Sequence, residues 1–316
     1  MNDIKAFIQK YSIIGVFLIL FAIFSVFVQS FLSTENLLNI IVQSSLLAVL
    51  ALGLKMVMMA GEIDISFSAS VPLLGSAFVL MIQEGINPGI AFLVILLIGM
   101  GIGLVNVLLI TKLKLNSFIT TVAVMFLLSG FWYATTSGQT VWLGETFNRD
   151  LIYGYIGPIP IVGLILLVLF IVLYFVSEHT RFGMALQAVR SDAEAARSSG
   201  INVFSTKAAA FLIAGAVFAL SALLSVARMS GAMAQSGADV MLPTMTIAFV
   251  GQSVLSMGRP NMWGILIGAL LLGMVNNAFV IMNLPFWSVP MSYGIILMIS
   301  IALANIGQNQ IKQIRM

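Results

Sequence analysis

Long apolar runs, separated by short polar or glycine-containing stretches, recur along the whole chain. Each run is continuous rather than alternating, which favours membrane-spanning helices over the strands of a membrane barrel. At about 20 residues per helical span, the pattern predicts ten spans, at residues 11–31, 38–60, 70–83, 90–110, 117–137, 157–177, 207–228, 240–257, 263–283 and 287–305. We therefore expect an all-α integral membrane protein.

Composition agrees with lipid as the main solvent. Of 316 residues, 60% are hydrophobic and 8% are charged, whereas a soluble domain carries about 25% charged residues. We expect one transmembrane domain over residues 1–316. The absence of cysteine excludes disulfides and thiolate sites, and His179 as the only histidine excludes a metal site built on two imidazoles. The first apolar run is too long for a signal-peptide core and is expected to be a transmembrane helix.

Lysine and arginine gather on one side of the predicted membrane. With the N-terminus inside, the inner segments contain Lys5, Lys10, Lys112, Lys114, Arg181, Arg190, Arg197, Lys207, Arg259, Lys312 and Arg315. The outer segments contain Arg149 and Arg228, together with the acidic Glu35, Glu84, Glu145, Asp150 and Asp239. Because cytoplasmic loops are enriched in basic residues, both termini are predicted to be cytoplasmic.

Two parts of the chain resemble each other. Each has a proline followed five residues later by Ala-Phe-Val, and further on a Gly-x-Val-Asn stretch; these are Pro72 and Gly103–Asn106 in one copy, and Pro243 and Gly273–Asn276 in the other. Under the predicted topology the copies run in opposite directions. Spans 2–5 and 7–10 would then form an inverted repeat, an architecture common among transporters. Chance similarity between apolar sequences is the alternative.

Polar residues interrupt the boundary between the second and third spans. Glu62, Asp64 and Ser66 follow Gly61 there, and Lys55 precedes them by about two helical turns, where it could pair with Glu62 or Asp64. Carboxylates near hydrocarbon are costly and usually face a cavity or the bundle interior. They could line a translocation route or tie two helices together at the cytoplasmic boundary.

Buried amides are predicted in two later spans, at Asn106, Asn276 and Asn277. Hydrogen bonding between helices is their usual role. A water-lined pathway for a polyol would also use neutral donors and acceptors of this kind. Both roles stay open from the sequence.

The longest cytoplasmic stretch, residues 178–206, predicts two short surface helices, Met184–Arg190 and Ala193–Ser199. Asp192 is placed to cap the second helix, and Gly200 to end it. Such a segment could receive force from a soluble motor, or it could be a plain connection.

Several motifs of this chain resemble those of ribose-type ABC transporter permeases. The stretch from Thr180 to Val189, followed by Glu194-Ala195-Ala196-Arg197-x-Ser199-Gly200-Ile201, is similar to that family's coupling loop. Gly61–Ser66 resembles its Gly-Gly-Ile-Asp-Leu-Ser signature, and Gly258–Asn261 and Asn276-Asn277 fall where the family often carries such residues. Glu62 departs from the signature, Asp192 stands where asparagine is usual, and Gln252-Ser253 interrupts a turn that is typically glycine-rich.

The resemblance implies a permease subunit in a bacterial inner membrane, importing a monosaccharide such as ribose or a related small polyol. Its implied partners are ABC ATPase subunits, a soluble substrate-binding protein and a second permease subunit, as a homodimer; nucleic acid is not expected. The chain has no Gly-x-x-x-x-Gly-Lys-Ser/Thr motif, so we expect neither an enzyme nor a cofactor of its own. ATPase coupling is implied for Ala188, Arg190, Asp192, Glu194, Ala195, Ala196, Arg197 and Gly200. The translocation pathway is implied for Asp64, Ser66, Asn106 and Asn276.

An ion-coupled secondary transporter is the main alternative, because inverted repeats are common in that class. Such a protein would place a coupling-ion site in mid-span, whereas the carboxylates here lie at span ends. An intramembrane enzyme is disfavoured because Asp64 has no aspartate within helical reach, and His179 has no serine with which to form a plausible catalytic pair.

Overall fold

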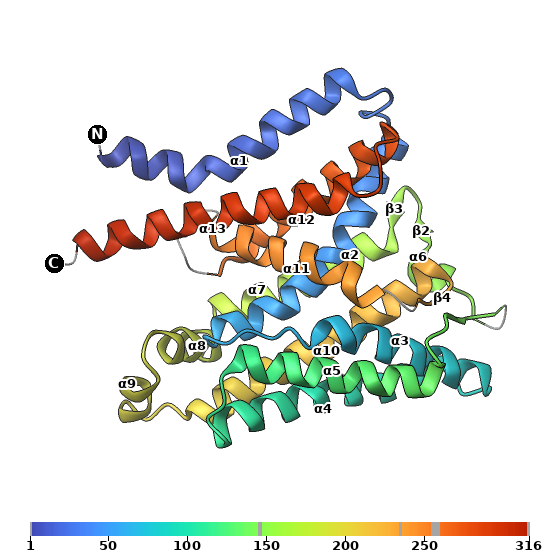
Figure 1. Ribbon diagram of the computed structural model, residues 1–316, viewed down its shortest axis with the longest axis horizontal. Helices are drawn as coiled ribbons and strands as arrows, with labels where there is room; N and C mark the ends of the chain where they lie inside the picture. The colour runs from blue at the N-terminus through green and yellow to red at the C-terminus, as the bar shows by residue number, and fades with distance from the viewer. Residues whose placement is uncertain (1, 145–146, 234–235, 254–259, 315–316) are drawn as a thin grey trace. The chain divides into compact units, whose positions relative to one another are not determined.

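The computed structural model describes residues 2–144, 147–233, 236–253 and 260–314. Within this part, the long helices are α1 (Asn2–Phe27), α2 (Thr34–Met59), α3 (Phe67–Gln83), α4 (Pro88–Lys112), α5 (Ser117–Thr136), α7 (Ile161–Glu178), α10 (Val203–Met229), α11 (Ser236–Ser253), α12 (Met262–Ile281) and α13 (Ser288–Ile314) (Figure 1). The shorter elements are α6 (Asp150–Tyr153), α8 (Arg181–Ser191), α9 (Ala193–Ser198), β1 (Val141–Trp142), β2 (Tyr155–Ile156), β3 (Ile159–Pro160) and β4 (Gly231–Ala232). The sequence positions Glu145, Gly258, Arg259 and Arg315 lie outside the described residues.

Each predicted span overlaps one of the long helices. Six of them, α2, α4, α5, α7, α10 and α12, are long and apolar enough to cross a membrane. Shorter apolar stretches occupy Ile13–Phe27, Phe67–Gln83 and Ser288–Ala302. The chain is thus a helical, multi-pass membrane protein, and the total of ten crossings stays a prediction.

The helices begin where the sequence supplies a cap. The side chains of Asn87, Asn116 and Asn202 accept hydrogen bonds from backbone N–H groups in the first turns of α4, α5 and α10, at 2.9, 3.2 and 3.0 Å. These caps satisfy donors that have no partner within a helix. The capped starts of α4 and α5 lie within two residues of the predicted spans, and the capped start of α10 lies four residues before the predicted one.

The chain divides into two compact units. Unit 1 comprises residues 1–51 and 242–316, and unit 2 comprises residues 52–241. The unit boundaries fall inside α2 and α11.

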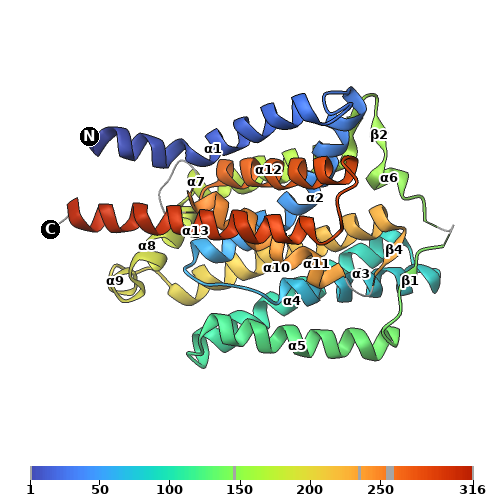
Figure 2. The ribbon, with the colours of Figure 1, turned by 45° about the horizontal axis from the view of Figure 1, so that its top comes forward.

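In unit 2, α10 packs against α3 and α4, and α5 packs against α3 and α4. Figure 2 shows α3, α4, α5 and α10 running alongside one another. The backbones of α4 and α10 touch at glycine: a Cβ on Gly99 would overlap the Gly215 carbonyl, and one on Gly103 would overlap the Phe211 carbonyl. Only glycine at positions 99 and 103 leaves room for this close approach of the two helices.

One end of unit 2 carries a short antiparallel pair of strands, β1 and β4. β1 pairs antiparallel with β4, aligning Val141 with Ala232, and the Arg149 guanidinium donates to Ser230 Oγ at 2.6 Å. β2 and β3 form a second small hairpin. The sequence analysis did not predict these contacts, because two-residue strands carry no periodic signal.

In unit 1, α1, α12 and α13 lie side by side. The Phe24 ring of α1 lies 5.8 Å from the Phe31 ring and 6.5 Å from the Phe279 ring of α12. Gly264 of α12 abuts the Gly251 backbone of α11. Aromatic rings and glycine contacts therefore supply the close packing of this unit.

Candidate functional site

The break between α2 and α3 is built from a glycine turn. Gly61 has φ +83°, the Gly61 N–H donates to Met58 O at 3.2 Å, and the Glu62 N–H donates to Val57 O at 3.3 Å. This pair of bonds is a Schellman motif, which ends a helix where glycine adopts the left-handed conformation. Residues 60–66, here called the α2–α3 link, stay non-helical until α3 begins at Phe67.

The interior end of the link holds a buried polar cluster of Asp64, Ser66 and Asn106. Asp64 Oδ1 accepts from the Ser66 N–H at 2.8 Å and from Ser66 Oγ at 2.6 Å. Asn106 Nδ2, from α4, donates to Ser66 Oγ at 2.8 Å and lies 3.4 Å from Asp64 Oδ2. All three side chains are at most 2% exposed. Neutral donors surround the carboxylate, so the cluster holds α4 against the link.

Two helix hydroxyls complete the attachment of the link. Thr121 Oγ1 of α5 accepts from the Ile65 N–H at 3.1 Å, and Ser117 Oγ accepts from the Ile63 N–H at 3.4 Å. Without these acceptors the two N–H groups of this non-helical backbone would be costly to bury. The sequence analysis missed Ser117 and Thr121. The available signal was a Ser-x-x-Thr-Thr run at the start of an apolar helix.

Two ion pairs flank the link. Glu62 pairs with Lys207 of α10, and both side chains are less than 15% exposed. Lys55 lies 3.7 Å from Glu178 at the end of α7, with the lysine 1% exposed. The predicted pairing of Lys55 with Glu62 or Asp64 is therefore wrong. Lys55 points toward α7, while Glu62 turns toward the first turn of α10.

The amides predicted to be buried in α12 lie in unit 1, where Asn277 is buried and Asn276 is half-buried. Asn276 Nδ2 donates to Gln43 Oε1 at 3.2 Å, and Asn277 Nδ2 donates to Asn36 Oδ1 at 2.8 Å. Both bonds join α12 to α2. Asp64, Ser66 and Asn106 thus form one cluster in unit 2, and Asn276 belongs to a separate contact in the other unit.

The two short helices predicted in residues 178–206 are present as α8 and α9, at one end of unit 2 (Figure 1). Asp192 Oδ1 accepts from the Glu194 and Ala195 N–H groups at 2.9 and 3.0 Å. Gly200 has φ +84° and ends α9. The cap and the stop that the sequence predicted for this helix are both confirmed.

The exposure of α8 and α9 separates two sets of side chains. The exposed set is Arg181, Met184, Gln187, Ser191, Glu194, Ala195, Arg197 and Ser198, and the buried set is Gly183, Leu186, Val189 and Ala196. Arg190 is half-buried and donates to Met58 O of α2. Of the predicted coupling residues, Arg190 and Ala196 face the protein. Met184, 63% exposed, was missed and has no charge or capping signal.

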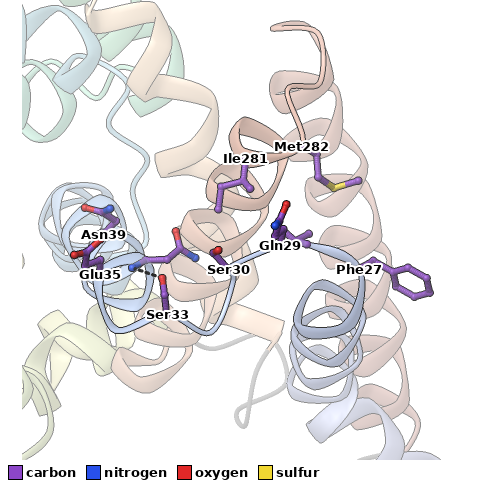
Figure 3. A pocket seen from close by; sticks show the side chains of 10 residues that line it. Phe27, Gln29, Ser30, Ser33, Glu35, Asn39, Ile281 and Met282 are labelled. Carbon is purple, nitrogen blue, oxygen red and sulfur yellow. Dashed lines mark hydrogen bonds between the residues drawn. The ribbon is translucent and has the colours of Figure 1, made fainter.

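Unit 1 carries an open depression of about 520 Å³ beside the α1–α2 turn (Figure 3). Its polar lining consists of Gln29, Ser30, Ser33, Glu35, Asn36 and Asn39, and Ile281 and Met282, at the C-terminal end of α12, close one side. The Asn36 N–H donates to Ser33 Oγ at 3.3 Å across the turn. Hydroxyl and amide groups here could contact a hydroxylated solute only weakly, because most of them face solvent.

Among the described residues, no group of three histidine, cysteine, aspartate or glutamate side chains is arranged to hold a metal ion. The polar chemistry of the site consists of ion pairs, amides and hydroxyls. In the described part of the chain, these groups bind one another and hold helices together.

The sequence is similar to one protein family and to several named permeases of transport systems. Residues 36–304 match the family described as branched-chain amino acid transport system / permease component. The ribose import permease protein RbsC of Escherichia coli (strain K12) is 28% identical over 310 residues, covering 95% of each chain. The L-arabinose ABC transporter permease protein AraH of Azospirillum brasilense is 30% identical over 311 residues, 96% of this chain and 89% of that one. The autoinducer 2 import system permease protein LsrC of Photorhabdus luminescens is 26% identical over 271 residues, 85% and 82% of the two chains. No solved structure shows significant similarity.

Proposed function

The chain belongs to the family of branched-chain amino acid transport system / permease components, and we propose that it is the permease subunit of an ABC importer for a monosaccharide or a related small polyol. The observation that carries this proposal is the near full-length match to a ribose import permease, at 95% coverage of both chains. The relatives named for arabinose and autoinducer 2 support a sugar-like cargo. They argue against the ion-coupled alternative.

The proposed partners follow from what the chain lacks. It contains no phosphate-binding loop motif, so energy would come from two ABC ATPase subunits. A soluble binding protein would deliver cargo from outside, and a second permease copy would complete the route as a homodimer. The permease itself needs no bound cofactor in this arrangement.

We propose that the α8–α9 end of unit 2 is cytoplasmic. Lys112, Lys114, Arg190, Arg197 and Lys207 belong to this end, because Lys112 Nζ lies 4.9 Å from the Phe204 ring of the first turn of α10. The opposite end holds Arg149, Asp150 and the β1–β4 pair. By the positive-inside rule the first end faces the cytoplasm, which supports cytoplasmic termini and an inner-membrane location.

The contacts within each unit support the inverted repeat. In unit 2, α4 packs against α10 through Gly103 and Phe211. In unit 1, α12 packs against α2 through Gly273 and Ser44. The third helix of each proposed copy thus contacts the first helix of the other copy, as two-fold internal symmetry requires. Ten crossings, with spans 2–5 repeated as 7–10, are the architecture we propose.

Sugar passage along Asp64, Ser66, Asn106 and Asn276 stays a proposal for the route. The first three bind one another in the interior of unit 2. We propose that they shape the route by fixing the α2–α3 link, and that Asn276 does so through its bond to Gln43. A route with few fixed charges suits a neutral polyol, which must be released rather than held.

The exposed residues of 188–200 and the exposed face of α8 are the proposed ATPase-docking surface, while Arg190 and Ala196 face the protein. Met184 would enter an apolar pocket of the ATPase, and Glu194 and Arg197 would form the charged rim. The latter two lie 3.4 Å apart and are 82% and 66% exposed. Ala188, Asp192, Ala195 and Gly200 would shape the two helices, with Asp192 as the cap between them.

Reconstitution tests the function directly. The purified chain, its ATPase and its binding protein are placed in proteoliposomes, and uptake of radiolabelled ribose is measured with and without internal ATP. We expect uptake only with ATP and binding protein together. Uptake that persists without ATP, driven by an imposed proton or sodium gradient, would refute the proposal.

The docking surface has its own test. Met184→Glu and Glu194→Lys are expected to reduce co-purification of the ATPase, because each places the wrong chemistry on the outward face. Asp150→Lys, an exposed charge reversal at the opposite end of unit 2, is the matched control. The double variant Glu194→Arg/Arg197→Glu keeps the pair within the helix but reverses its surface charges. If the ATPase co-purifies with all four variants at the wild-type yield, α8 and α9 are not the docking surface.

A further inference from the structure

Residues before, within and after the proposed coupling segment 188–200 contact the end of α2 and the α2–α3 link. Glu178 precedes that segment and pairs with Lys55 of α2 at 3.7 Å. Lys207 follows the segment and pairs with Glu62 of the link. Arg190, between them in α8, donates to Met58 O at the end of α2. From this arrangement we infer that the α2–α3 link, with Arg190 as its main contact, transmits movement of α8 to the helices of unit 2; this rests on the proposed function.

The contact between α8 and the link is close and directional. A Cβ at Gly61 would lie 3.4 Å from Arg190 Cα and 3.8 Å from Arg190 Cβ. The backbone of α8 therefore lies against the turn itself, and the guanidinium reaches past it to the α2 carbonyl. A cation at a helix C-terminus also interacts favourably with the helix dipole. A displacement of α8 cannot occur without moving this turn or breaking the contact.

The other end of the link reaches the interior within a few residues. Ile63 and Ile65 donate their N–H groups to Ser117 and Thr121 of α5. Ser66 accepts from Asn106 of α4. A short non-helical segment anchored at both ends has little slack, so a shift at Gly61 is passed to α4 and α5. Arg190, Glu62 and Lys207 are positioning residues in this scheme, because they act on the route through the link.

Coupling is separated from simple stability by measuring two rates on one preparation. Complexes carrying Arg190→Gln or Glu62→Gln are reconstituted with the ATPase and binding protein. ATP hydrolysis and radiolabelled ribose uptake are both normalised to the amount of assembled complex. We expect hydrolysis to persist while ribose moved per ATP falls by about 5–150-fold, the usual range of coupling between sites. Lys114→Gln, an exposed lysine on the α4–α5 connection, is the control and should keep the wild-type ratio.

A reversible cross-link gives a second, independent test. The chain has no cysteine, and the 3.8 Å separation of a Cβ at Gly61 from Arg190 Cβ matches the disulfide mean of about 3.8 Å. The double variant Gly61→Cys/Arg190→Cys should be uncoupled when reduced and should recover ribose moved per ATP when oxidised. Backbone strain at residue 61 is the same in both states, so it cancels. The single variant Gly61→Cys should not respond to oxidation.

The outcomes distinguish the two proposals. Wild-type complexes that show no ATP-dependent uptake of ribose, arabinose or another small polyol would overturn the proposed function. Wild-type complexes that transport, combined with an unchanged ribose-to-ATP ratio in the Arg190 and Glu62 variants, would overturn the transmission role alone. Equal ratios for the oxidised and reduced double variant would do the same, even if the single variants failed to assemble.

Discussion

Gly103→Ala and Gly101→Ala differ by two positions in α4 but should have opposite effects on stability. A Cβ at Gly103 would overlap the Phe211 carbonyl oxygen of α10 and lie 2.8 Å from its carbonyl carbon. A Cβ at Gly101 would meet no atom within 4 Å. The pair therefore isolates the contact between α4 and α10 from the general effect of replacing glycine in a helix.

The expected magnitude follows from these distances. Carbon atoms in favourable contact lie about 3.5–4.0 Å apart, so the α4 and α10 backbones must separate by about 1 Å. Overpacking of this kind costs about 1–3 kcal/mol. Alanine is favoured over glycine in a helix interior by about 0.5–1 kcal/mol, and both variants gain this. The difference in free energy of unfolding between them should thus be about 1–3 kcal/mol.

Thermal unfolding in detergent, followed by tryptophan fluorescence, measures the difference. Each kcal/mol corresponds to about 2–4 °C in Tm for a chain of this order of size. Gly101→Ala should match or exceed the wild-type Tm, and Gly103→Ala should fall below it. Asn106 lies almost one turn after Gly103, so a shift of α4 at residue 103 would also move Asn106. Gly103→Ala should therefore lose uptake as well. Equal Tm values for the two variants, or a lower value for Gly101→Ala, would refute the packing argument.

Three further substitutions test the site. Gly61→Ala forces a side chain into the left-handed region at φ +83° and should lower the free energy of unfolding by about 1–2 kcal/mol. An unchanged Tm would contradict the left-handed conformation assigned to residue 61. Asn106→Ala leaves Asp64 and Ser66 short of a buried donor, so a loss of about 1–3 kcal/mol is expected in the same assay, and Tm equal to wild type would count against the cluster. Asp192→Ala removes the α9 cap, worth about 1 kcal/mol, and should speed amide hydrogen exchange in α9 alone. An equal increase in exchange across α8 and α9 would contradict the assignment of Asp192 as the α9 cap.

The sequence predicted most of the helices because continuous apolar runs and caps are local signals. The Asp192 cap and the Gly200 stop could be assigned for the same reason, and the structure places both as expected. The short strands β1 and β4 could not be predicted, since their pairing joins residues far apart in the chain and each has only two residues.

The partners of charged residues were the harder part of the site. Lys55 lies closer in sequence to Glu62 than to Glu178, yet pairs with Glu178. Which acid a lysine reaches depends on how α7 and α10 pack against α2, and apolar periodicity does not encode that. Arg190 was predicted as a coupling residue from its motif alone. Only the fold shows that it contacts Met58 rather than facing outward.

The acidic groups at the α2–α3 link help to explain why an ATP-driven mechanism suits this chain. Asp64 accepts hydrogen bonds from Ser66 and Asn106. Glu62 forms an ion pair with Lys207, and Glu178 forms one with Lys55. A coupling ion or proton would have to displace one of these partners and would loosen the link as it bound. Removing one partner of a buried ion pair costs about 3–5 kcal/mol, and Glu62–Lys207, with both side chains less than 15% exposed, is such a pair. Glu62 is therefore poorly suited to binding and releasing an ion in each cycle. Because the link depends on these contacts staying intact, the proposed ATPase acting at α8 would move the link without displacing them.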